Sequence, residues 1–324
     1  MKSIARLKVN EGFISEPSTS VATQLFNQYW DARSFGAKQE MKSSHWQEYL
    51  SQSQITLRND GSYQIAIKGL AGLTSRTVFN YLKYPLMWIQ LMYLSFKFRL
   101  SIKSLSLMFR ISKKSNKLWD YDLLRQMLST MVMKSHIREV APKVVIIGDG
   151  FGMMGQIIKS IFPDSKVYFV NLGENLFLDA LFTGLVFPEP YYSHSIGDLY
   201  SENASTDFTY IAAGDQKAIA DIDVFINIAS MGEMDPESVN QYFQWIKKCS
   251  APSAIFYCCN RELKLLPDGT VSSFAQYPFD LLGGEVLLDE LCPWYQKWPT
   301  GKIPFWRKFD GPVRHKIVSF QGNL

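Results

Sequence analysis

The segment from Lys143 to Gly155 constrains the fold of this 324-residue chain more than any other. Its sequence is KVVIIGDGFGMMG, in which an apolar run enters a glycine-rich turn and continues into an amphipathic stretch. Glycine has no Cβ and adopts backbone angles that other residues avoid, so such a turn can approach a ligand closely. A helix that follows would present free N–H groups at its N-terminus. The segment therefore predicts a strand, a ligand-binding turn and a helix, in that order.

The glycine spacing fits two classes of cofactor. Gly150, Gly152 and Gly155 satisfy the G-x-G-x-x-G fingerprint of dinucleotide-binding folds. Gly148, Gly150 and Gly152 instead form the G-x-G-x-G turn of folds that bind S-adenosylmethionine, whose first glycine directly follows the strand. Since Gly148 directly follows the apolar run, we favour the second register. A tight turn without a ligand is a third interpretation, although three glycines in five residues carry an entropic cost that a structural turn rarely needs.

The C-terminal part of the chain alternates strand-like and helix-like segments. We expect strands at residues 143–147, 166–172, 208–212, 223–229, 254–260 and 315–320. Such alternation is typical of an open, largely parallel sheet with helices on both faces. We therefore predict a Rossmann-like α/β domain over residues 139–324.

Residues 1–138 are predicted to form a basic, mainly helical region. Helical apolar spacing occurs at residues 20–50, 74–108 and 121–137, and residues 55–67 alternate around Asn59-Asp60-Gly61 as in a hairpin. Lys and Arg outnumber Asp and Glu by 20 to 8 in this region, whereas the rest of the chain has 14 basic and 22 acidic residues. This asymmetry favours an anionic partner, either a phosphorylated or nucleotide-linked substrate or a membrane surface. No nucleic-acid-binding motif is present, so we do not expect a nucleic acid partner.

The apolar run Tyr84 to Phe96 has two interpretations. It contains thirteen uncharged residues, fewer than the about 20 that a bilayer span needs. It could be a buried helix, or an interfacial element with Lys97, Arg99, Lys103 and Arg110 facing lipid phosphates.

The cysteines and the N-terminus indicate a cytoplasmic protein. None of the four cysteines has CxxC or metal-ligand spacing, so we expect reduced packing residues. Met1 to Val9 is short and basic and lacks the apolar core of a signal peptide. The basic region extends this expectation to peripheral contact with the inner face of the membrane. The oligomeric state does not follow from the sequence.

Ligands bind such sheets at the carboxyl ends of the strands, where the chain reverses direction. The side chain after the second strand could hydrogen-bond ribose hydroxyls, and an acid after the third could accept from an adenine amino group. The fourth and fifth strands also end in polar residues. The expected cofactor-binding residues are Gly148, Asp149, Gly150, Gly152, Asn171, Leu172, Asp215 and Ser230.

Three segments resemble a known family. They are DVFINIASMGEMDPESVNQYF, FYCCNRELKLLPDG and FAQYPFDLLGGEVLLDELCPW, and they are similar to the sugar O-methyltransferases of bacterial polysaccharide gene clusters. The most specific part is Ser-Met-x-Glu-Met at 230–234, before a helix with Tyr242 and Phe243. The resemblance implies a class I methyltransferase fold, S-adenosylmethionine as methyl donor and a sugar or glycan hydroxyl as acceptor. It leaves open whether that acceptor is nucleotide-linked or lipid-linked.

Two positions depart from the broader methyltransferase pattern. Ile146 stands where an acidic residue commonly precedes the first glycine, and Asn171 replaces the usual ribose-binding acid. An amide binds a diol more weakly than a carboxylate does. Two alternatives therefore stay open, a non-catalytic scaffold of a polysaccharide assembly complex and a nicotinamide-dependent oxidoreductase.

Methyl transfer from a sulfonium needs in-line positioning and removal of the hydroxyl proton. Glu233, after the fourth strand, is our first candidate for the base or a substrate anchor, with loop ordering as the alternative. His194, which we expect in a loop after the second helix of this domain, is the second candidate. Asn260, Arg261 and His315 are candidates for binding the substrate. No carboxylates are spaced convincingly for a metal site, and metal dependence stays open.

Overall fold

The computed structural model describes residues 10–14, 19–31, 43–59, 61–67, 85–197, 206–215, 219–300 and 303–322. Residues 32–42 and 74–84 of the expected helical stretches lie outside these ranges, as do Asp60 of the expected hairpin turn and Met1 to Val9.

The central sheet of the described residues contains eight strands in the order β12-β15-β9-β8-β4-β5-β7-β6. The six neighbouring strands β6, β7, β5, β4, β8 and β9 are parallel to one another. Strand β15 lies between β9 and β12 and is antiparallel to both. The bounds are β4 (Lys143–Ile147), β5 (Lys166–Asn171), β6 (His194–Ile196), β7 (Phe208–Ala212), β8 (Ile222–Ile228), β9 (Ser250–Arg261), β12 (Glu285–Leu291) and β15 (Val313–Phe320). The prediction of a Rossmann-like, largely parallel α/β sheet is confirmed.

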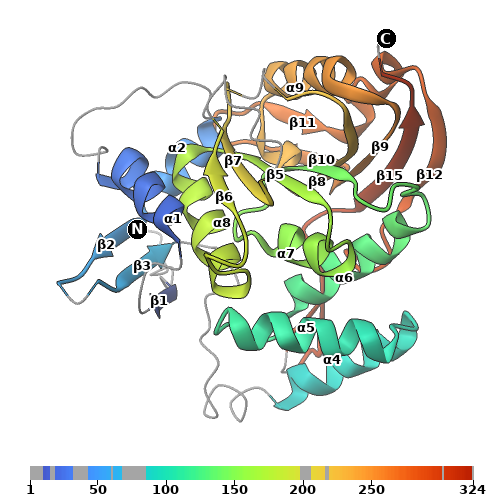
Figure 1. Cartoon of the computed structure of the whole chain (residues 1–324). Coiled ribbons are helices and arrows are strands. Elements are labelled where there is room, and N and C mark those ends of the chain that lie inside the picture. The colour runs from blue at the N-terminus through green and yellow to red at the C-terminus, as the bar shows by residue number, and fades with distance from the viewer. Residues whose placement is uncertain are drawn as a thin grey trace.

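Helices cover both faces of this sheet (Figure 1). The helices are α1 (Ser20–Phe26), α2 (Ser44–Ser51), α4 (Pro85–Lys97), α5 (Ile102–Lys114), α6 (Tyr121–Lys134), α7 (Met153–Ile161), α8 (Gly173–Val186) and α9 (Pro236–Cys249). The shorter turns are η1 (Asn27–Asp31), η4 (Met231–Glu233), η5 (Phe274–Gln276) and η6 (Phe279–Leu282). None of the helices in the described ranges combines the length and the apolar character needed to cross a bilayer.

Strand β4 explains why its sequence is continuously apolar. Successive side chains of a strand point to opposite faces, and both faces of this sheet are covered. Val144 and Ile146 lie in the core shared with α6, α7 and α8, whereas Val145 and Ile147 lie in the core shared with α9. Ile146 is therefore a core residue. The sequence has a packing reason for an apolar side chain at this position.

The strand order creates a switch point next to β4. From β4 the chain proceeds to β5 and β7 on one side, and it returns to β8 and β9 on the other. The loops after β4 and β8 therefore diverge at neighbouring strand ends, which is where doubly wound sheets bind their ligands.

The N-terminal region contains helices and a small antiparallel sheet. Strands β1 (Asn10–Ile14), β3 (Tyr63–Ile67) and β2 (Gln54–Leu57) form this sheet, and the β2–β3 pair confirms the predicted hairpin. The described part of the 74–108 stretch forms two helices, because the chain turns at Arg99, whose φ is +54°. Ser101 then caps α5 by accepting from Ser104 N at 3.1 Å.

Elements that the sequence did not predict lie at the sheet edges. His194, expected in a loop, begins the edge strand β6, and β12 completes the opposite edge. Two small hairpins also form, β10 (Leu263–Leu265) with β11 (Val271–Ser273), and β13 (Lys297–Pro299) with β14 (Trp306–Lys308). Strands β6, β10, β11, β13 and β14 have three residues each, too few for an alternating pattern to distinguish them from loops.

One hydrophobic core joins the N-terminal region to the α/β sheet. The ring of Phe177 on α8 lies 5.5 Å from that of Phe26 and 5.0 Å from that of Tyr63, measured between centroids. In addition, Trp30 Nε1 donates to Glu174 O at 2.8 Å. Residues from both sides of the predicted 138/139 boundary therefore contribute to the same core.

We predict that Phe177→Ala destabilises the protein by about 3–5 kcal/mol, because the ring is fully buried and its removal leaves a cavity. Phe305→Ala is the matched control, since that ring is about half exposed, and its cost should stay within about 1 kcal/mol. Urea unfolding measures both. Equal losses in the two variants would contradict the shared aromatic core.

Candidate functional site

The three glycines after β4 all have left-handed backbone conformations. Their φ angles are +74° at Gly148, +88° at Gly150 and +62° at Gly152. A Cβ at Gly148 would lie 2.4 Å from Ser230 Oγ, and one at Gly152 would lie 2.2 Å from Thr183 Oγ1. A Cβ at Gly150 would meet nothing within 4 Å. The turn is therefore packed against the protein at its two ends and faces open space in the middle.

A pocket of about 500 Å³, part of it open to solvent, lies at the carboxyl ends of β4, β5, β7 and β8. The N-terminal helix α2 and helix α9 border it. It is lined by Ser43, Trp46, Gly148, Val170, Asn171, Leu172, Ala213, Ser230, Met234, Ser238 and Tyr242. The structure thus brings together Gly148, Asn171, Leu172 and Ser230 from the predicted cofactor-binding set. Asp149, Gly150, Gly152 and Asp215 do not line the pocket themselves.

Asn171 faces the protein with both groups of its amide. Its Nδ2 donates to Asp179 Oδ2 at 2.9 Å, and its Oδ1 accepts from Leu172 N at 2.9 Å. The other carboxylate oxygen of Asp179 accepts from Gly152 N at 2.8 Å. Asn171 and Asp179 therefore hold the glycine turn in place from the second strand and its following helix.

Asp179 is a residue that sequence reasoning missed. It is fully buried on α8, and burial together with the nearby Asp149 carboxyl holds its pKa well above the usual range, against the hydrogen bond from Asn171. The available signal was an acidic residue within the apolar run LFLDALF. Such residues are rarely buried without partners.

Asp149 serves helix α7. Its Oδ2 accepts from Gly155 N at 3.0 Å, so the carboxylate satisfies an N–H group in the first turn. Burial raises its pKa to about 6, although backbone N–H groups and Lys117 oppose that rise. Lys117 is itself buried, 4.0 Å from the ring centroid of Phe151, and burial lowers its pKa to about 8.

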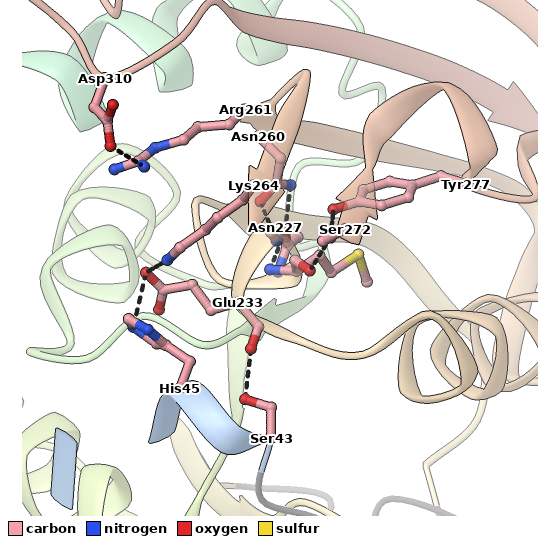
Figure 2. Close-up of polar contacts among 12 residues, drawn as sticks. Ser43, His45, Asn227, Glu233, Asn260, Arg261, Lys264, Ser272, Tyr277 and Asp310 are labelled. Carbon is pink, nitrogen blue, oxygen red and sulfur yellow. Dashed lines mark hydrogen bonds and ion pairs between the residues drawn. The ribbon is translucent and has the colours of Figure 1, made fainter. Parts of the chain in front are cut away.

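Asn227, Ser230 and Asn260 hold the chain that leaves β8 against the end of β4, and Figure 2 shows the contact between Asn227 and Asn260. Asn227 Nδ2 donates to Ile147 O at 3.0 Å and to Ser230 Oγ at 2.5 Å. Asn260 Nδ2 donates to Asn227 Oδ1 at 2.7 Å, and Asn260 Oδ1 accepts from Gly232 N at 2.8 Å. Asn260, predicted to bind substrate, is thus buried and positions the turn η4.

Glu233 lies at the end of η4, partly buried and held from two directions (Figure 2). Its Oε1 accepts from Lys264 Nζ at 2.7 Å and lies 3.3 Å from His45 Nε2. Burial raises the pKa of Glu233, but the His45 hydrogen bond and the Lys264 charge outweigh it and hold the pKa below its usual value. Its Oε2 takes no hydrogen bond from any residue in the described ranges.

Helix α2 reaches this site from the N-terminal region. Ser43, at its N-cap position, donates its hydroxyl to Glu233 O at 2.5 Å, while Trp46 lines the pocket. The ring of His45 stacks on that of Tyr49, 5.7 Å away. No pattern in the sequence indicated His45 or Ser43, because both are separated from Glu233 by about 190 residues along the chain.

The remaining predicted residues lie elsewhere. His194 pairs with Phe208 at the amino end of β7, and its ring nitrogens lie 3.0 Å from Tyr210 OH and 2.7 Å from Phe187 O. The structure does not bring His194 to the pocket. These contacts hold it at the amino ends of the strands, whereas the pocket lies at their carboxyl ends.

His315 and Arg261 have partners of their own. His315 is buried in β15, with Nδ1 3.2 Å from Tyr257 OH. Arg261 forms an ion pair with Asp310 at 3.0 Å. Among the described residues, no group of three or more His, Cys, Asp and Glu side chains could hold a metal ion.

We predict that Gly148→Ala destabilises the protein more than Gly283→Ala. Both glycines have left-handed φ angles, which cost an alanine about 1–2 kcal/mol, but only the Cβ at 148 meets another side chain. That clash with Ser230 should add about 1–3 kcal/mol. Urea unfolding of each variant measures the difference. The loss in Gly148→Ala/Ser230→Gly should be smaller than the sum of the single losses, and strict additivity would contradict the predicted clash.

The chain has low similarity to several solved structures, some of which are methyltransferases. No family model and no curated protein matches it. The pyocyanin biosynthetic protein PhzM has a TM-score of 0.39 at 12% identity, over 61% of this chain and 57% of PhzM. A SAM-dependent methyltransferase from Aquifex aeolicus has a TM-score of 0.36 at 13% identity, over 59% of this chain and 89% of that protein. A mycolic acid cyclopropane synthase complexed with SAH has a TM-score of 0.41 at 10% identity, over 60% of this chain and 85% of that protein. At these scores the fold class rests on the strand order of the chain itself.

Proposed function

We propose that this chain is an S-adenosylmethionine-dependent O-methyltransferase that acts on a hydroxyl of a sugar or glycan, in surface polysaccharide biosynthesis. The pocket is the observation that carries the proposal. It lies at the switch point of a Rossmann-like sheet and is bordered by the left-handed glycine turn. Glu233 does not line it, but Met234, the next residue, and Ser43, which donates to Glu233 O, do. The sugar acceptor rests on the family resemblance of residues 223–243, 256–269 and 274–294.

The residues around the pocket fit S-adenosylmethionine. The backbone at Gly150 faces open space, which allows the turn to approach a ligand. Leu172, Trp46 and Tyr242 offer apolar and aromatic surface for a flat base. The hydroxyls of Ser43 and Ser238 donate to Glu233 O and Asp235 Oδ2, so they are available to a ligand only as acceptors. When bound there, S-adenosylmethionine supplies a methyl group carried on a sulfonium.

Asn171 limits how the ribose can be held. Because its amide is engaged by Asp179 and Leu172 N, it has less to offer a diol than a free carboxylate would have. We expect a lower cofactor affinity as a result. The same observation favours the second candidate function, a non-catalytic scaffold of a polysaccharide assembly complex.

Glu233 is the residue that we assign to the acceptor hydroxyl. Lys264 and His45 keep its carboxylate ionised through Oε1, which leaves Oε2 to accept the hydroxyl proton. A base within hydrogen-bond reach is required because a sugar hydroxyl is a weak acid. The rest of the work is positioning, in which α2 and η4 hold the acceptor between the N-terminal region and the sheet.

The proposal is tested by transfer of isotope-labelled methyl from S-adenosylmethionine to nucleotide sugars, lipid-linked oligosaccharides and finished polysaccharide. We expect label in the sugar of one of these pools. Glu233→Gln should lower kcat/KM by about 10²–10⁴-fold, since the amide cannot take the proton. Glu237→Gln, an exposed acid four residues away, is the matched control and should retain activity. A wild-type rate in Glu233→Gln would overturn the assignment, and absence of label in every pool would favour the scaffold.

We predict that Lys264→Met shifts the acid limb of the kcat/KM profile to higher pH. In the wild type the limb should lie below the ordinary glutamate value of 4.5, since activity needs an ionised Glu233 and its pKa is lowered. Removing the Lys264 charge raises that pKa. Lys248→Met, on the exposed side of α9, serves as the control. An acid limb that does not move in Lys264→Met would contradict the assignment of the proton to Glu233.

A further inference from the structure

Helix α4 is apolar on all sides, yet only one side is covered. Leu91 and Leu94 are buried against the core, as expected for a packed helix. On the opposite side, Phe96 is 85% exposed and Ile89 is 65% exposed. A helix that is hydrophobic all round is normally buried on every side. The buried-helix interpretation therefore holds for one side of α4 only. The apolar side chains of Ile89 and Phe96 on the other side stay mostly exposed.

Neighbouring segments expose further apolar side chains. Ile102, which begins α5, is 83% exposed. Ile303 and Phe305 are also exposed, and they belong to a loop that contacts α4, where Gln90 Nε2 donates to Phe305 O and Tyr93 packs edge-on against Trp306 at 6.2 Å. We call this surface the α4 face. It consists of Leu86, Ile89, Met92, Tyr93, Phe96, Ile102, Ile303 and Phe305.

The charged residues in the segment that carries α4 and α5 are all basic. No acidic residue occurs between Asp60 and Asp120, whereas ten Lys and Arg do. Those nearest the face, Lys97, Arg99 and Lys103, are exposed, and none of them forms an ion pair with a carboxylate of the described residues. An exposed apolar surface with an uncompensated basic rim complements an anionic interface.

We propose that the α4 face docks onto a membrane surface that contains anionic phospholipids. Helix α4 has 13 residues and cannot span a bilayer, so it lies in the plane of the interface with Phe96 and Ile89 among the acyl chains. Lys97, Arg99 and Lys103 then meet lipid phosphates. This inference does not depend on the proposed methyl transfer.

Docking in this way leaves the pocket accessible. In Figure 1, α4 lies at the lower edge of the molecule beneath α5, and α2, which borders the pocket, lies on the opposite side. A helix that borders the candidate site therefore lies away from the proposed membrane contact.

The test is flotation of the full chain with vesicles of phosphatidylcholine alone or mixed with phosphatidylglycerol. Wild type should float with the mixed vesicles, and added salt should weaken the binding. Phe96→Ser/Ile102→Ser should bind roughly tenfold more weakly or worse, because less apolar surface is buried. Val140→Ser/Tyr191→Ser is the matched control, since those side chains are 83% and 82% exposed elsewhere on the protein, and it should bind as wild type does.

A charge-reversal set separates the basic rim from the apolar face. Changing Lys97, Arg99 and Lys103 together to Glu should weaken binding to mixed vesicles on the order of a hundredfold. The control, with Lys134, Arg138 and Lys248 changed to Glu, alters the net charge equally and should bind more tightly than the rim variant.

Three results would overturn the proposal. The first is wild-type protein that does not float with anionic vesicles at low salt. The second is equal loss of binding in the matched variants and their controls. The third is a dimer, seen by sedimentation velocity, that Phe96→Ser/Ile102→Ser abolishes, which would assign the α4 face to a second copy of the chain. Because Phe96 and Ile102 are exposed, these variants should unfold at the wild-type temperature, and that measurement excludes misfolding as the cause.

Discussion

The absence of a Cβ at Gly148 is the constraint on which the candidate site depends. Ser230 lies where that Cβ would be, and its Oγ donates to Ile147 O at 2.9 Å. The ends of β4 and β8 are thereby held together at the switch point of the sheet. Asn227 and Asn260 continue this connection to η4, and η4 carries Glu233. The glycine turn and the candidate base are therefore parts of one hydrogen-bonded unit.

The N-terminal region completes the site as well as the core. Ser43 and His45 contact Glu233 from α2, and Trp46 forms part of the pocket lining. The same region contributes most of the exposed apolar residues of the α4 face. The basic, mainly helical region is thus more than a support for the sheet, since it supplies groups to two separate surfaces.

The sequence predicted the sheet well because its strands are buried on both faces. Their apolar runs gave 143–147 and 208–212 with the observed bounds, and the other four core strands to within a few residues. Edge strand β6 was missed, because three half-buried residues carry no such pattern. Cys258 and Cys259 show the same burial on both faces, because they are adjacent on β9 and their side chains lie in the two different cores.

The site was harder to predict than the fold. The pocket lies at the strand ends, and four of the residues that we predict to bind the cofactor line it: Gly148, Asn171, Leu172 and Ser230. The sequence could not tell which polar groups are held by other residues. Asn171 lines the pocket while its amide is hydrogen-bonded to Asp179 and to Leu172 N, and Asn260 is buried and holds η4. His45 could not be found, because its proximity to Glu233 depends on how α2 packs against the sheet.

The most direct test of the account is a calorimetric titration of the purified protein with S-adenosylmethionine, with NADH and NADPH run alongside. The account predicts micromolar binding of S-adenosylmethionine and no heat from either nicotinamide. Binding of NADH or NADPH alone would contradict it and assign the pocket to an oxidoreductase. Absence of binding by all three would contradict it as well, and the scaffold interpretation would then account for the engaged amide of Asn171.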